Sequence, residues 1–111
     1  MTRLLERGGV SLEASGSVLR VEGQVGFEVA TALAEAGRGW LAGQPAETAV
    51  SFDLTGVADV SSAALSVLLE WARAARAAGL TLEAVRLSPA LRRLTDLAGL
   101  ERLLPLAGAA A

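Results

Sequence analysis

The chain has no histidine, cysteine or tyrosine among its 111 residues, and its ten basic residues are all arginine. Without cysteine it can form no disulfide, and without cysteine or histidine it has no site of the zinc-binding kind. The same absences exclude a nucleophile activated by a histidine base. Acid–base chemistry would fall on carboxylates, which are scattered along the chain. We therefore expect a non-catalytic protein with no catalytic residues, no metal and no cofactor.

Strong charge of one sign and long hydrophobic runs are also absent. The formal net charge is −2 and the isoelectric point is about 5.1, which argues against a nucleic-acid partner because such binders carry clustered positive charge. The start, MTRLLERGG, lacks the apolar region of a secretory signal. No apolar run approaches the roughly 20 residues that span a bilayer. We expect a cytoplasmic protein with no direct membrane insertion.

Turn residues and hydrophobic periodicity divide the chain into short elements. We expect a flexible arm over residues 1–9, one domain over residues 10–106 and an alanine-rich tail over residues 107–111. The expected strands are Val10–Ala14, Val18–Glu22, Thr48–Leu54 and Leu80–Leu87, and the expected helices are Phe27–Trp40, Ser62–Ala78 and a third that begins at Ser88-Pro89 and ends at Gly99. Helical spacing places Phe27 on the inward face of the first helix and Leu97 on that of the third.

The order of these elements predicts the fold class. It is β-β-α-β-α-β-α, and Leu100–Leu106 is either a last edge strand or an apolar tail. Strand–helix–strand units require right-handed crossovers and a parallel pairing of their strands. We therefore expect an α/β domain with a single sheet of four to five mostly parallel strands and helices mainly on one face.

The segment Ser51–Leu69 carries the most distinctive chemistry. A strand passes through a polar loop, Thr55–Asp59, to Ser61 and Ser62, which open a helix. The purely structural interpretation is a helix cap, since a serine side chain there accepts a hydrogen bond from a free backbone N–H. The functional one is a polar contact or phosphate acceptor at the positive end of the helix dipole. The two roles are compatible.

The second helix also has a spare apolar stripe. Leu65, Leu68, Leu69 and Ala72 form the core stripe, and a second stripe beside it consists of Ala64, Val67, Trp71, Ala74 and Ala78. Trp71 either packs over a neighbouring helix or anchors a docking face with Ser66, Glu70 and Arg73 as its polar rim. Asp53 and Asp59 suggest a carboxylate pair, but aspartates in strands and turns usually bond local backbone amides.

Two stretches resemble the STAS domain family. Asp53-Leu54-Thr55-Gly56-Val57 ends the central strand, and Val60-Ser61-Ser62-Ala63-Ala64-Leu65 opens the next helix. The resemblance covers about residues 8 to 106. Ser62 matches the hydroxyl that is phosphorylated in kinase-controlled members. Ser61 and Gly26 stand where the family has aspartates, and Ala64 stands where it has glycine.

The resemblance implies a function. It is strongest to the MlaB-type accessory subunits, which implies docking on the ATPase of an ABC transporter that moves phospholipid, peripheral to the inner membrane through that partner. The implied contact residues are Ser61, Ser62, Ala63, Ser66, Val67, Glu70 and Trp71. The alternative is an anti-sigma factor antagonist switched by phosphorylation at Ser62, with an anti-sigma factor kinase as its partner. Loss of both aspartates favours the first. Pairing with a second copy of the chain stays open.

Overall fold

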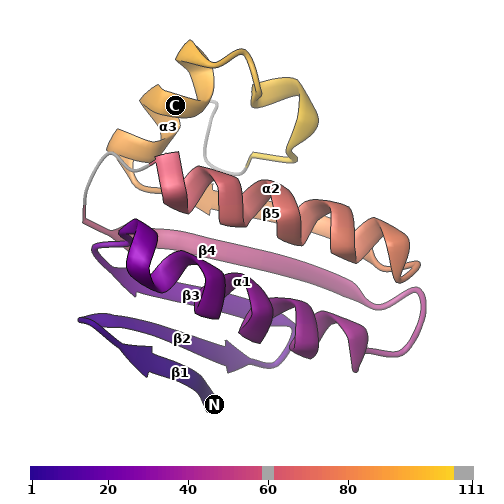
Figure 1. Cartoon of the computed structure of the whole chain (residues 1–111). Coiled ribbons are helices and arrows are strands. Elements are labelled where there is room, and N and C mark those ends of the chain that lie inside the picture. The colour runs from indigo at the N-terminus through magenta and orange to yellow at the C-terminus, as the bar shows by residue number, and fades with distance from the viewer. Residues whose placement is uncertain (59–61, 107–111) are drawn as a thin grey trace.

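A computed structural model describes residues 1–58 and 62–106. One five-stranded sheet has the strand order β1-β2-β3-β4-β5, with the first three strands antiparallel and the last three parallel. Helices α1 and α2 cover one face of this mixed sheet, and α3 packs at its β5 edge (Figure 1). The elements are β1 Thr2–Arg7, β2 Val10–Ser15, β3 Val18–Gly23, α1 Phe27–Ala42, β4 Ala49–Val57, α2 Ser62–Ala77, β5 Thr81–Leu87, α3 Pro89–Leu97 and the short 3₁₀ helix η1 Glu101–Leu103.

The expected α/β fold with a single sheet is confirmed, and its first strand lies in the segment predicted to be a flexible arm. Residues 2–7 form β1, which pairs with β2 along its length. Gly8 and Gly9 make the connecting turn with φ angles of 58° and 78°. Two successive positive φ angles match the twist of a two-residue hairpin turn, and glycine adopts them without steric cost. The glycine pair is therefore a hairpin turn, and the prediction of an arm is wrong.

The C-terminal part of the domain differs from the expected edge strand. After α3 the chain forms η1, and Leu106 then makes a single parallel bridge to Val85 of β5. The Val85 N–H donates to the Pro105 carbonyl oxygen at 2.9 Å. Proline has no backbone N–H of its own, so a regular ladder cannot begin at Pro105. The tail over residues 107–111 lies outside the described residues.

The core lies between the helices and one sheet face. Trp71 and Phe52 are its largest fully buried side chains, with ring centroids 5.5 Å apart. The Trp71 Nε1–H donates to the Ala34 carbonyl oxygen of α1 at 3.2 Å. A Cβ atom at Gly37 would lie 2.2 Å from the indole, so this glycine makes the room that the ring occupies. Trp71 thus packs over the neighbouring helix, and its assignment to an exposed docking face is wrong.

The opposite face of the sheet carries a row of alternating charge. Each strand contributes one directly paired residue to the row, which runs Arg3, Glu13, Arg20, Asp53 and Arg86. Two neighbouring pairs lie within ion-pair distance, at 2.8 Å for Arg3–Glu13 and 3.4 Å for Arg20–Asp53. Opposite charges that face each other across strands stabilise their pairing modestly. No helix of the described part covers this face (Figure 1).

Other boundary predictions have mixed outcomes. Ser88 caps α3 as expected, its Oγ accepting from the Leu91 N–H at 3.3 Å. β4 continues through the predicted loop to Val57, because Gly56 pairs with Glu22 of β3. Phe27 and Leu97 were expected to face inward and are instead exposed, by 79% and 87%. Each stands at an end of its helix, where helical periodicity no longer fixes contact with the core.

Candidate functional site

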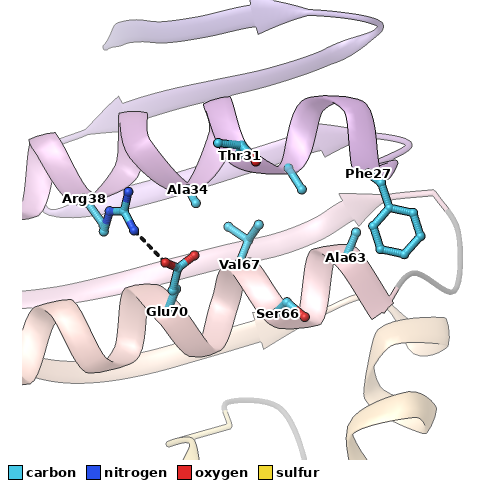
Figure 2. A pocket seen from close by; sticks show the side chains of 9 residues that line it. Phe27, Thr31, Ala34, Arg38, Ala63, Ser66, Val67 and Glu70 are labelled. Carbon is cyan, nitrogen blue, oxygen red and sulfur yellow. Dashed lines mark hydrogen bonds and ion pairs between the residues drawn. The ribbon is translucent and has the colours of Figure 1, made fainter.

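A groove runs between α1 and α2 on the outer surface of the helical layer. Its volume is about 320 Å³, and both helices contribute to its walls (Figure 2). The lining residues are Phe27, Ala30, Thr31, Ala34 and Arg38 from α1 and Ala63, Ser66, Val67 and Glu70 from α2. The walls thus combine an apolar floor with a polar rim.

Small side chains create this groove. Ala34 on α1 lies across the gap from Val67 on α2 (Figure 2), and Ala30 and Ala63 also line the groove. Ala63 and Val67 are almost fully buried and line the groove, so they form part of its floor. A row of alanines lets two helices approach closely at the level of the backbone but leaves the outer part of the interface unfilled.

Phe27 lies at the end of the groove that is nearest the start of α2. It is the first residue of α1, after Gly26, whose extended φ of −99° begins the helix without a side-chain cap. The ring points out beside Ala63 and is 79% exposed (Figure 2). Large exposed aromatic side chains are typical anchors of protein interfaces. Helical periodicity predicts Phe27 in the core, so the sequence alone does not mark it as a site residue.

An ion pair crosses the groove further along the helices. Arg38 Nη1 of α1 lies 2.6 Å from Glu70 Oε1 of α2 (Figure 2). Both side chains are more than 40% exposed, so the pair stabilises the fold by at most about 1 kcal/mol. Its two charges are accessible to a partner, which can compete for either of them.

Ser62 begins α2 close to the groove without lining it. It is exposed, and Ser66 one turn later is exposed and does line the groove. Ser61 lies outside the described residues. Of the seven predicted contact residues, the structure brings Ala63, Ser66, Val67 and Glu70 to one groove and buries Trp71 below it. None of the predicted contact residues belongs to the α1 wall, which includes Thr31 and Arg38.

Asp53 has a structural role on the open sheet face. Its Oδ1 accepts hydrogen bonds from the Thr55 N–H at 3.0 Å and the Thr55 hydroxyl at 2.6 Å. Burial raises the pKa of Asp53, but the Thr55 hydrogen bonds and the charges of Arg20 and Arg86 outweigh it and hold the pKa below 3.8. The local bonding predicted for this aspartate is confirmed, while Asp59 lies outside the described residues.

The described ranges 1–58 and 62–106 contain no cluster of three histidine, cysteine, aspartate or glutamate side chains that could hold a metal ion. Within the same ranges, no helix has the length and apolar character that a membrane crossing requires.

These features define a small α/β domain with a groove between helices α1 and α2, whose floor is apolar and whose rim is polar. The family model described as Mlab, STAS domain matches residues 9–105, and the chain belongs to this family. A solved structure of similar fold is an anti-sigma factor antagonist from Mycobacterium paratuberculosis, with 27% identity and a TM-score of 0.68 over 89% of this chain and 84% of that chain. No curated protein matches the chain significantly.

Proposed function

We propose that this protein is a non-catalytic STAS subunit that docks on the ATPase of an ABC-type phospholipid transport system. Docking would support assembly and activity of the ATPase in the cytoplasm, at the inner membrane. The observation that carries the proposal is the match of residues 9–105 to the Mlab family model. It is supported by the groove between α1 and α2, which provides a place for the partner.

The groove suits a protein side chain better than a cofactor. At about 320 Å³ it is at the small end of ligand pockets, and its floor is made of alanine and valine. We propose that an apolar side chain of the ATPase fills the groove while Phe27 packs against the partner surface. Ser62 and Ser66 then form polar contacts at the start of α2, and Arg38 and Glu70 meet charged groups at the other end.

Such a module acts by differential affinity. If the docked surface of the ATPase is intact only in its assembled form, binding shifts the population toward that form. No bond chemistry in this chain is needed for the effect, which is consistent with its lack of histidine, cysteine, lysine and tyrosine.

Co-purification with the ATPase tests the proposal. We expect Phe27→Ala and Ser62→Arg to abolish capture of the ATPase while the domain stays folded, because both residues are exposed. The matched controls are Leu97→Ala, at an exposed leucine on α3, and Ser15→Arg, at an exposed serine of the β2–β3 hairpin. Undiminished capture by both test variants would refute the proposed surface.

A second candidate function is an anti-sigma factor antagonist. The solved relative from Mycobacterium paratuberculosis supports it, together with the exposed position of Ser62 at the first residue of α2. A phosphate there would add about two negative charges and disrupt docking by repulsion and desolvation. Gly26 and Ser61 stand where the phosphorylated members of the family have aspartates beside this hydroxyl. The loss of both carboxylates favours the transport role.

Phosphate transfer from the cognate serine kinase distinguishes the two functions. Incorporation into the wild type that is lost in Ser62→Ala and retained in Ser66→Ala would support the switch. No incorporation, together with retained binding of the transporter ATPase, would exclude it.

A further inference from the structure

A second hollow lies on the side of α2 that faces away from α1. It is bounded by the end of α2, the start of β5 and the segment after α3, which lies on this side of α2 in Figure 1. Its volume is about 460 Å³, which exceeds that of the groove between the helices. None of the residues that line this hollow belongs to the proposed docking surface.

The charged groups of the hollow are both cationic. Arg76 and Arg102 line it, and none of its described lining residues carries a carboxylate. The Arg76 guanidinium donates to the Leu103 carbonyl oxygen at 2.9 Å, which holds it at the rim. Within residues 1–58 and 62–106, Arg102 makes no ion pair or side-chain hydrogen bond. This concentration of positive charge is local, because the chain as a whole has a net charge of −2.

The rest of the hollow is apolar. Leu103 is 51% exposed, Pro105 is exposed and Leu82 is half-buried, while Leu80 and Leu104 are almost fully buried. A guanidinium binds phosphate through two parallel N–H donors, and an apolar surface next to it takes an alkyl chain. The combination fits a ligand that is anionic at one end and apolar at the other.

We propose that this hollow binds an anionic phospholipid, with its phosphate on Arg76 and Arg102 and an acyl segment along Leu82, Leu103 and Pro105. An extended peptide fits less well. Adding a strand at this edge would need the outward N–H of Val85, and that group already donates to Pro105. The inference is independent of the proposed docking function.

Titration of the isotope-labelled full chain with dihexanoylphosphatidylglycerol, followed by amide NMR shifts, tests the site. We expect saturable shifts confined to the end of α2, β5 and residues 100–106, weakened by salt. Arg102→Gln should reduce the affinity about tenfold, because hydrogen bonds to charged groups are lost. Leu103→Ser, at a half-exposed rim leucine, should reduce it about fivefold. The matched control is Arg7→Gln, at an exposed arginine of β1, which should leave the affinity unchanged.

Three outcomes would overturn the assignment. Absence of saturable shifts would remove the site. Equal affinity for dihexanoylphosphatidylcholine or for inorganic phosphate would reduce it to a surface without selectivity for an anionic lipid. Tighter binding of an acidic peptide at the same amides would assign the hollow to a protein partner. Co-purification with the ATPase is measured separately, so failure of either inference leaves the other standing.

Discussion

Replacing Gly37 with alanine tests how closely α1 and α2 pack above the core. The added Cβ would lie 2.2 to 2.5 Å from three atoms of the Trp71 indole, which is rigid and fully buried. Overpacking of this kind costs about 1–3 kcal/mol, and displacing the ring also weakens its hydrogen bond to Ala34, worth about 1 kcal/mol. The better helix propensity of alanine returns about 1 kcal/mol. We expect a net loss of about 1–3 kcal/mol in the free energy of unfolding.

Gly39 provides the matched control in the same helix. A Cβ there would meet nothing within 4 Å, so Gly39→Ala should stabilise the domain by up to about 1 kcal/mol. Urea unfolding of both variants measures the difference directly. In the Trp71→Phe background, the cost of Gly37→Ala should shrink, because the smaller phenylalanine ring lacks the indole nitrogen and the fused ring that the Cβ meets. Equal stability of the two alanine variants would refute the described contact.

Further measurements test other contacts. Asp53→Asn should destabilise the domain at pH 7, and this loss of stability should shrink as the pH falls below 3.8. A carboxyl group whose pKa is lower in the folded state stabilises the fold above its unfolded pKa. It loses that contribution as the pH falls through the folded pKa. Urea unfolding at pH 7 and pH 3 checks this, and a pH-independent difference would contradict it. Ser88→Ala should cost about 1 kcal/mol through loss of the α3 cap, measured by the same unfolding assay, and no change would show that the Leu91 hydrogen bond contributes nothing. A double-mutant cycle on Arg38 and Glu70 should give a coupling of about 0.2–1 kcal/mol that disappears in concentrated salt, and a coupling unaffected by salt would contradict the exposure of the pair.

Sequence patterns were sufficient for the parts of the fold that one strong local signal specifies. Ser88-Pro89 marks the start of α3 because a cap and a proline act at adjacent positions. The glycine pair at residues 8–9 is also a strong signal, but it has two interpretations. A flexible break and a tight hairpin need the same residue type, and only pairing of Thr2–Arg7 with β2 decides between them.

The candidate site was predictable on one wall only. Ala63, Ser66, Val67 and Glu70 follow from the start of α2 and the family resemblance. The α1 wall depends on how two helices cross, which no local pattern specifies. Trp71 shows the same limit: its burial requires a glycine at position 37, and that pairing spans 34 positions along the chain. The burial of Trp71 and the α1 wall were therefore out of reach of local patterns, because both depend on residues that meet only in the tertiary structure.

Strand order along the sheet is identical to strand order along the chain. Each strand that leaves the ribosome therefore finds its only earlier neighbour already synthesised at the growing edge, and no position has to be kept open for a later segment. Such a topology lets the sheet be extended strand by strand from the N-terminus during translation.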